Sequence, residues 1–491
     1  MAAPGNTNTT VGGLLKRFYK DPDGLTMSTF TQRPYWAMIQ KLPDTSPTEG
    51  SSFQFAVEYN DVQSRNTVFG SAQAQARNLS GFGPNVQAFT QTVAGPPNVG
   101  SLGVVQFSVP RTFNYSYINI STELQLSSKT KAGAFAEAIV KISQSALNVL
   151  ANDQEISMFG GSTNSSLLTG NPISTCSTGF ISQLGVGTSL SSGLVQLPSA
   201  YDSTRFSSGQ ELDLYWNNAG VITKRINVTG SGLFIGQVNR TTGQFQNVNA
   251  AGNPVSITSV FSDAALGDYI CVTNDFNQGA ATGIQANGKL LGFESWCPFG
   301  GPVADSPTNL FCGINRNQYD VTRLAGNWID GTGQLYNTNN PLYGTVMNIE
   351  DVLIAMGVAV NTNSDGDIDT YAMNFNNRRR LNNSNITRTT LPGGKAQTAI
   401  PSLGFKATQV ETDNGSALVI PDRFCGANRV YGLQMDTWSY IHLGEPVQVY
   451  SLDGKDMLRE ADLDALAMRV FSFGNMVCSK PVANCTANVA L

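Results

Sequence analysis

A helical pattern runs through residues 129–160, KTKAGAFAEAIVKISQSALNVLANDQEISMFG, and it is the longest such pattern in the chain. No Pro interrupts it, and apolar residues recur at steps of three and four: Phe135, Ile139, Ile142, Ala146, Val149 and Leu150. At about 1.5 Å per residue, this helix would be roughly 45 Å long and would end at the Gly160-Gly161 pair. A helix of that length needs other elements to pack on it. The segments on either side of it therefore indicate the overall architecture.

The composition favours a β-rich protein with many turns, or one whose surface is covered by neighbours. Only 13% of the 491 residues are charged and 49 are Gly, whereas ordinary soluble domains are about 25% charged. Charged residues are depleted at the cores of association interfaces. The net charge of −5 argues against a dedicated nucleic-acid-binding protein, whose affinity rests on clustered Lys and Arg.

Residues 1–48 predict an extended N-terminal arm. They combine a polar start, a short amphipathic piece at 11–19 and a Pro-punctuated stretch around Trp36, and they cannot build a core of their own. No signal-peptide pattern is present in the first ten residues, and no apolar run approaches the roughly 20 residues of a membrane span. We therefore expect synthesis in a cytoplasm and no membrane partner. The seven Cys are scattered without a Cys-x-x-Cys pair, which favours reduced, structural thiols.

Residues 49–126 predict a long β-hairpin loop. Phe53, Phe55, Val57 and Tyr59 alternate with polar residues, as in a half-buried strand. A stretch rich in Gly, Ala, Gln and Asn follows at 70–103, and loops of this length are usually functional or disordered. The alternation of apolar and polar residues then resumes, and its six large apolar residues all have odd numbers: Val105, Phe107, Val109, Phe113, Tyr115 and Tyr117. A two-stranded arm is too thin to be stable alone, so we expect it to rest on a partner surface.

Four segments follow the long helix. Residues 127–220 contain that helix and short apolar runs, and residues 221–275 predict a compact β module inserted into the body. Residues 276–364 end in a helix at 348–360, with Asn348 as N-cap and an apolar stripe through Val352 and Met356. Residues 365–445 contain strand patterns at 370–375, 416–420 and 429–433. Residues 446–491 predict a strand at 446–450, a helix at about 457–471 and a strand at 476–482. The fold class is α+β.

No catalytic or metal-binding constellation emerges from the sequence. His442 is the only histidine and has no nucleophile motif beside it, so a packed or surface histidine is favoured over a catalytic base. The stretch Asn361 to Asp369 has the spacing that opens an EF-hand loop, but Ala372 stands where calcium sites carry a Glu, which favours a polar turn. The basic run of Arg378, Arg379 and Arg380 favours solvated side chains beside a turn. We expect no enzyme activity and no cofactor.

The order of these parts resembles that of the major capsid proteins of tailed phages, which share the Hong Kong 97-type fold. Residues 11–20, VGGLLKRFYK, are similar to the start of the N-terminal arm in that family. Gly313-Ile314-Asn315-Arg316, followed by Leu324-Ala325-Gly326, is similar to a segment before its second peripheral helix. Residues 417–421 (ALVIP) and 431–438 (YGLQMDTW) look like the strand that closes its axial domain, and 457–482 resembles its C-terminal return.

The resemblance implies a subunit of an icosahedral head shell. Residues 49–126 would be the extended loop, 129–160 the spine helix of a peripheral domain that continues at 276–364 and 446–491, and 365–445 the axial domain. It implies hexamers and pentamers enclosing double-stranded DNA without sequence-specific binding, assembly in a host bacterial cytoplasm and residence in the virion. A separate scaffolding protein, a portal and a decoration protein would be partners. Candidate subunit contacts are Trp36, Val105, Phe107, Val109, Phe113, Tyr115, Tyr117, Phe135, Ile139, Arg316, Arg378 and Arg379.

Two alternatives stay open. An encapsulin shell shares the fold but encloses a protein cargo, and encapsulins are typically shorter and lack the long arm and the inserted module. A β-rich secreted carbohydrate-binding protein or hydrolase fits the Gly, Asn, Ser and Thr content, but the missing signal peptide and the single histidine count against it.

Overall fold

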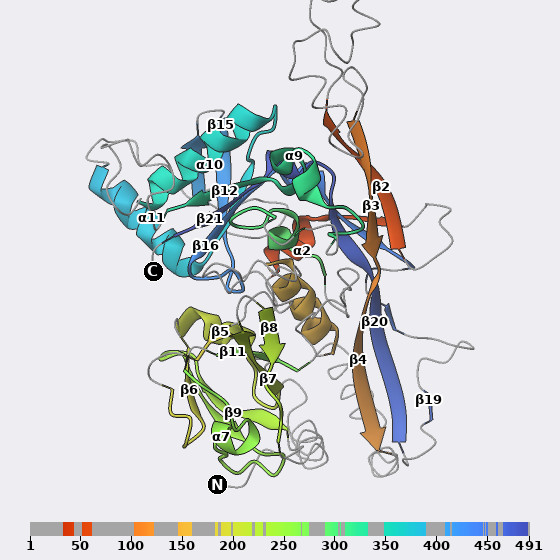
Figure 1. Ribbon diagram of the computed structural model, residues 1–491, viewed down its shortest axis with the longest axis vertical. Helices are drawn as coiled ribbons and strands as arrows, with labels where there is room; N and C mark the ends of the chain where they lie inside the picture. Colours follow the sequence, from red (N-terminus) through yellow and green to blue (C-terminus); the bar gives the residue numbers. More distant parts are fainter. Residues whose placement is uncertain are drawn as a thin grey trace, which may run out of the picture.

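The computed structural model describes residues 33–43, 52–60, 103–121, 146–159 and 348–388, and, with short gaps, 182–273, 290–331, 408–449 and 458–489. These parts form a mixed α+β molecule with three larger sheets and one hairpin (Figure 1). Across the described ranges, no helix is long and apolar enough to cross a membrane.

A sheet built on the long strand β20 (Ala465–Cys478) runs down one side of the molecule (Figure 1). On one edge, β20 pairs along ten residues with β4 (Thr112–Ser121). On the other edge it pairs with β17 (Trp438–His442), β18 (Gln448–Val449) and β19 (Leu458–Arg459). A short N-terminal strand, β1 (Gln40–Pro43), adds to β17 in parallel. The helix predicted at 457–471 is therefore wrong, because residues 465–471 pair as a strand with β4.

The hairpin of β2 (Ser52–Asn60) and β3 (Gly103–Pro110) forms an antiparallel pair, as the alternating pattern predicted. Only Arg111 separates β3 from β4, so one extended segment belongs first to the hairpin and then to the long sheet. The two pairs follow one another along the side of the molecule in Figure 1. Gly474 pairs with Thr112 on one edge and His442 on the other. A Cβ there would lie 2.5 Å from the Ile441 carbonyl oxygen, so this junction requires glycine.

A second sheet has the strand order β12-β21-β16-β13-β15-β14. Its strands are Asn327–Asp330, Cys485–Asn488, Arg429–Leu433, Thr370–Met373, Gly415–Pro421 and Thr408–Thr412, in that order. Helix α10 (Ile349–Asn363) confirms the helix predicted at 348–360 and packs on this sheet through Val352, Leu353 and Met356. Helix α11 (Phe375–Arg388) follows β13.

A third sheet, the β module, has seven strands and its own core, which includes Leu214, Ile235 and Phe245. Its strands are β5 (Ser182–Gln183), β6 (Leu194–Gln196), β7 (Glu211–Asn218), β8 (Val221–Lys224), β9 (Leu233–Asn239), β10 (Gln244–Val248) and β11 (Tyr269–Val272). Helices η3 (Ala200–Arg205) and α7 (Ile257–Val260) complete it. Because β5, β6 and β7 belong to the same sheet, the module begins near 182 and not at the predicted 221. Figure 1 shows it as a separate lobe.

The described part of the long helix covers residues 146–158, and the expectation for 129–145 lies outside the described residues. Its end contributes Met158 and Phe159 to a large core in which Phe159 lies edge-on to Tyr35 and Phe293, with ring centroids 5.3 and 5.5 Å apart. Short elements complete this region: α2 (Pro34–Met38), α8 (Phe293–Trp296), η4 (Arg316–Gln318), α9 (Val321–Ala325), η5 (Met435–Thr437) and η6 (Pro481–Ala483).

Candidate assembly surface

Four aromatic side chains gather on one face of the β4–β20 pair, and we call them the aromatic patch: Phe113, Tyr115, Phe471 and Phe473. Phe471 is buried and Phe473 half-buried beside the two exposed rings of β4. The rings of Phe113 and Phe473 meet edge-on at 5.3 Å, and Tyr115 lies 5.6 Å from Phe473. Phe113 is 51% exposed and Tyr115 60% exposed. Large aromatic residues exposed side by side mark surfaces that proteins cover with a partner.

The aromatic patch arises because the buried face changes between β3 and β4. In β3, Val105, Phe107 and Val109 are buried, and Phe107 packs on Trp296 with a centroid distance of 5.3 Å. In β4, the buried side belongs to Thr112, whose hydroxyl donates to the Gly474 carbonyl at 2.5 Å, and to Asn114. The sequence pattern predicted that the odd-numbered residues of both strands behave alike. This is wrong, because the described odd-numbered residues are buried in β3 and exposed in β4. The three β3 residues are core residues of this chain and do not line a free surface.

The N-terminal segment 33–43 lies on the end of helix 146–158. The carboxylate of Glu155 accepts hydrogen bonds from the backbone N–H of Tyr35 at 3.0 Å and of Trp36 at 2.6 Å. Arg33 donates to the Asn148 side chain at 2.7 Å. The Trp36 ring is half-buried against Tyr440, 4.9 Å away edge-on, so this predicted contact residue packs on its own chain. We call this arrangement the clasp.

A second carboxyl faces Glu155 inside the clasp. Asp422 is 2% exposed and Glu155 is fully buried, and the two carboxyls are hydrogen-bonded to one another. Burial raises the pKa of both groups, that of Asp422 to about 6, and the charge of Asp422 raises the pKa of Glu155 further. Arg205 and Arg423 oppose the rise at Asp422, whose Oδ1 also accepts from the Phe424 N–H at 2.6 Å. The pair therefore holds a proton above the usual range of a carboxylic acid.

Arg316 is wrongly predicted as a contact residue. Its side chain is fully buried and pairs with Asp305 at 2.7 Å, and it also donates to the carbonyl oxygens of Ser295 and Trp296. The guanidinium lies 3.9 Å from the centre of the Phe311 ring. Arg316 therefore ties α8 to the neighbouring loops of the same chain.

The other predicted contact residues have mixed outcomes. Arg378 and Arg379 lie on α11, where Arg379 is exposed and Arg378 is half-buried; the run is helical and does not flank a turn. Burial lowers the pKa of Arg378. Tyr117 lies in β4 opposite Arg469 in the backbone pairing. Phe135 and Ile139 lie outside the described residues.

The described residues contain no group of His, Cys, Asp and Glu side chains that could hold a metal ion. The stretch Asn361 to Asp369 is the end of α10 followed by a turn into β13, in which Ser364 accepts from the Gly366 N–H and Asp369 from the Met435 N–H. His442 is packed, with Nδ1 at 2.7 Å from the Gly444 carbonyl oxygen. Five cysteines of the described ranges have free, buried thiols: Cys297, Cys312, Cys425, Cys478 and Cys485.

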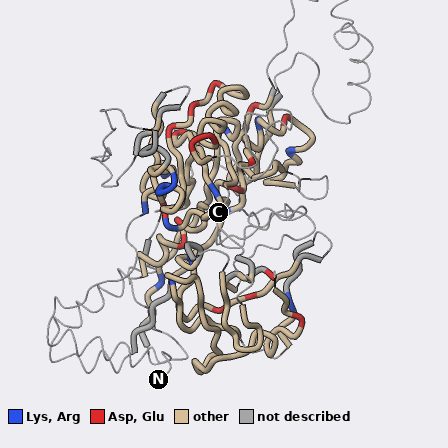
Figure 2. The backbone as a smooth tube through the Cα atoms, turned by 90° about the vertical axis from the view of Figure 1, so that its left-hand side faces the viewer, with Lys and Arg blue, Asp and Glu red and all other residues tan. Residues whose placement is uncertain are grey.

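Charged residues are thinly distributed over the described backbone, with both signs interspersed (Figure 2). Two aromatic patch residues, Phe471 and Phe473, were missed from the sequence: Phe471 ended the predicted helix at about 457–471, and Phe473 lay between that helix and the strand predicted at 476–482. Their alternation with Ser472 and Gly474 is a period-two signal that favours a strand. The exposed rings of the patch are apolar features that this weakly charged surface offers to another molecule.

No family model matches the chain, and no curated protein matches it in sequence. Solved structures similar to it over nearly its whole length include a subunit in the capsid asymmetric unit of cyanophage A-1(L), which is 10% identical, covers 95% of this chain and 94% of that chain, and has a TM-score of 0.44. The capsid structure of cyanophage P-SCSP1u is 9% identical over 95% and 91% of the two chains, with a TM-score of 0.38. The SrpI encapsulin of Synechococcus elongatus is 6% identical over 96% and 93%, with a TM-score of 0.35.

Proposed function

We propose that this chain is a shell-forming subunit, the major capsid protein of a tailed phage with the Hong Kong 97-type fold. The observation that carries the proposal is the aromatic patch on one face of the β4–β20 pair. Phe113 and Tyr115 are more than half exposed there. Exposed aromatic clusters of this kind are unfavourable in water and are enriched at protein interfaces. The occupant that fits best is another copy of the same chain, as in a homo-oligomeric shell.

The construction of the chain supports this proposal. The hairpin is anchored to the body by buried residues such as Phe107, which belong to its main core. Its pairing continues directly into β4, which carries the exposed rings. The low charge suits extensive contacts between subunits, and the net charge of −5 limits non-specific attraction of packaged DNA to the protein.

The remaining assignments belong to the same proposal. Residues 49–126 are the extended loop, residues 129–160 the spine helix of a peripheral domain that continues at 276–364 and 446–491, and residues 365–445 the axial domain. The subunits form hexamers and pentamers in the virion after assembly in the bacterial cytoplasm, with a separate scaffolding protein, a portal and a decoration protein as partners. The chain has a structural and not an enzymatic role.

The test is an assembly experiment on the full chain, co-produced with a scaffolding protein where one is needed. We expect rings or closed shells by light scattering and negative-stain microscopy. The double variant Phe113→Ser, Tyr115→Ser should lose assembly but keep the circular dichroism of the folded subunit. The matched control is Phe375→Ser, which removes an exposed aromatic residue outside the patch, 47% exposed at the start of α11, and should assemble normally.

A wild-type chain that stays a 52.4 kDa monomer under all these conditions would overturn the proposal. If the double variant forms normal shells, the aromatic patch is not part of the contacts between subunits. Particles from the native source separate the two shell functions, because a phage head contains DNA and an encapsulin contains protein.

A further inference from the structure

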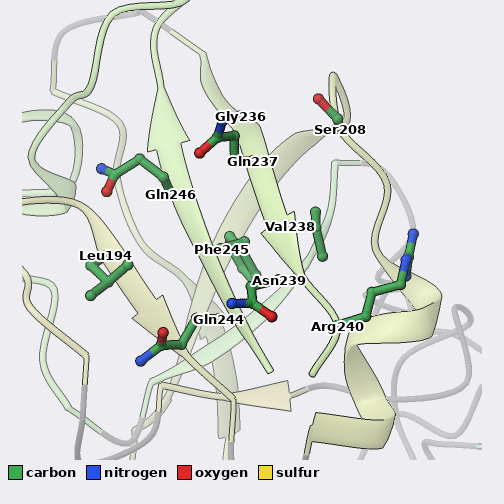
Figure 3. A pocket seen from close by; sticks show the side chains of 10 residues that line it. All are labelled: Leu194, Ser208, Gly236, Gln237, Val238, Asn239, Arg240, Gln244, Phe245 and Gln246. Atoms are coloured by element: carbon green, nitrogen blue, oxygen red, sulfur yellow. The ribbon is translucent and has the colours of Figure 1, made fainter. Parts of the chain in front are cut away.

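A groove of about 870 Å³ lies on the β module, and the described residues that line it come from three adjacent strands and two loops (Figure 3). The lining includes four neutral amide side chains: Gln237, Asn239, Gln244 and Gln246. This volume is within the roughly 300–1,000 Å³ range of small-molecule sites in proteins.

The strand register brings three of these amides together on one face, those of Asn239, Gln244 and Gln246. Gln237 lies beside them at a bulge in β9. Gln244 of β10 lies opposite Asn239 of β9, and Gln246 lies opposite Leu194 of β6. Residues opposite one another in antiparallel strands point to the same side of the sheet. The next residue in β10, Phe245, points the other way and is buried in the core of the module. The sheet therefore supports a row of polar side chains on a rigid base.

Internal hydrogen bonds orient three of the amides and leave one end of each available. Both Thr241 and Thr242 donate their backbone N–H to Asn239 Oδ1, which turns Asn239 Nδ2 outward. The Nε2 atom of Gln246 donates to the carbonyl oxygens of Ser192 and Asn247, which leaves its Oε1 as an acceptor. Gln244 Oε1 accepts from the Thr242 hydroxyl at 3.2 Å, which leaves Nε2 as a donor. Ordered donors and acceptors of this kind reduce the entropy lost on binding.

The groove offers no free charge to an ionic ligand. Arg240 is the one charged residue in its lining, and its guanidinium donates to the carbonyl oxygens of Ser203 at 2.6 Å and Phe206 at 3.1 Å. The ligand that fits is neutral and carries both donors and acceptors. Hydroxyl groups have both properties, and amide side chains pair with them in both directions.

We propose that this groove binds a neutral oligosaccharide through the amides of Gln237, Asn239, Gln244 and Gln246. A protein partner fits the groove less well, because exposed large apolar residues of the described module lie elsewhere, at Ile226, Val228 and Leu266. Leu194 is the half-buried apolar contact for a sugar ring at one end of the amide row. Saccharide binding is separate from shell formation and needs only the folded chain.

The test measures binding of three neutral trisaccharides, maltotriose, cellotriose and chitotriose, to the full chain by saturation-transfer NMR and calorimetry. An acidic trisaccharide of galacturonic acid serves as the charged comparison. We expect at least one neutral sugar to bind, and Gln237→Ala and Gln244→Ala each to weaken that binding about tenfold, the effect of one lost hydrogen bond between protein and ligand. The control Asn253→Ala removes an exposed amide of the same module outside the groove and should bind as the wild type does.

The two glutamine variants retain the buried residues of the module, and thermal unfolding followed by circular dichroism verifies that each is folded. Absence of binding by all three neutral sugars up to about 10 mM, where even a very weak site is detectable, would overturn the proposal. Equal affinity of wild type and both groove variants would overturn it as well, and so would preference for the acidic sugar.

Discussion

The Oε2 atom of Glu155 accepts a hydrogen bond of 2.6 Å from the backbone N–H of Trp36, which joins the N-terminal segment to the end of the long helix across 119 positions of sequence. Glu155 and Tyr35 are fully buried, so the Glu155 carboxyl and the Tyr35 N–H group are shielded from water. Buried polar groups of this kind are strongly unfavourable when one partner is removed.

Glu155→Ala should therefore lower the free energy of unfolding by about 3 kcal/mol, since it leaves the N–H groups of Tyr35 and Trp36 without acceptors. Urea unfolding measures the change, and limited proteolysis near residue 33 reports release of the segment. Val149→Ala, at a 53% exposed position of the same helix, should change stability by less than about 0.5 kcal/mol. Equal values for the two variants would contradict the role assigned to the clasp.

The carboxyl pair predicts a decrease of stability as the pH rises from about 4 to above 6. The pKa of Asp422 in the folded chain is about 6, against an ordinary value of 3.8. The folded state therefore binds more protons than the unfolded state in this window, and the free energy of unfolding falls with pH, by an amount on the order of 2–3 kcal/mol. Arg33 and Lys41, the charged groups of the N-terminal segment near Glu155, stay protonated throughout.

Asp422→Asn should reduce that pH dependence, because it removes the titration of Asp422 while its amide can donate to Glu155 at every pH. Buried Glu155, whose pKa is also raised, accounts for the part that is left. Urea unfolding at several pH values compares the two proteins. Identical slopes for the wild type and Asp422→Asn between pH 4 and 6.5 would show that other groups determine the pH dependence.

Phe107→Ala should cost about 3–5 kcal/mol, because the ring is fully buried and packs on Phe55, Trp296 and Phe311. The neighbouring Val104 is 50% exposed, so Val104→Ala should have little effect. Thermal unfolding of both variants measures the difference. A small effect of Phe107→Ala would mean that the hairpin does not rest on the body.

Arg316→Met should destabilise the chain by about 3–5 kcal/mol, because it leaves Asp305 buried without its partner. Adding Asp305→Leu to this variant should restore part of the loss, since the double variant contains no unpaired buried charge. Urea unfolding of the two single variants and the double variant gives the coupling energy. Additive losses in the double variant would contradict the ion pair.

Local patterns in the sequence predicted the elements in which burial alternates regularly. The strands of the hairpin and α10 were identified correctly, because their apolar residues repeat with the period of a strand or a helix. The stretch at 465–471 was predicted as part of a helix, and its Ala, Leu and Met residues do favour helices in isolation. Its pairing with β4, more than 340 positions earlier, overrides that preference.

The candidate surface was only partly predictable for the same reason. Phe113 and Tyr115 were named from their strand pattern, but Phe471 and Phe473 join them only through the β4–β20 pairing. Arg316 was expected at a subunit contact. Its burial depends on Asp305 lying at 2.7 Å, which no periodic pattern reveals.

The continuous extended segment 103–121 has a mechanical consequence. It pairs with β2 in its first half and with β20 in its second half, with only Arg111 between the two strands. Hydrogen bonds in an antiparallel pair lie perpendicular to the strands. A force applied to the hairpin along this segment therefore acts in shear on the ten residue pairs that join β4 to β20. All of those bonds share the load at once and do not open one after another. A pull on the hairpin is therefore transmitted to the far end of the long sheet.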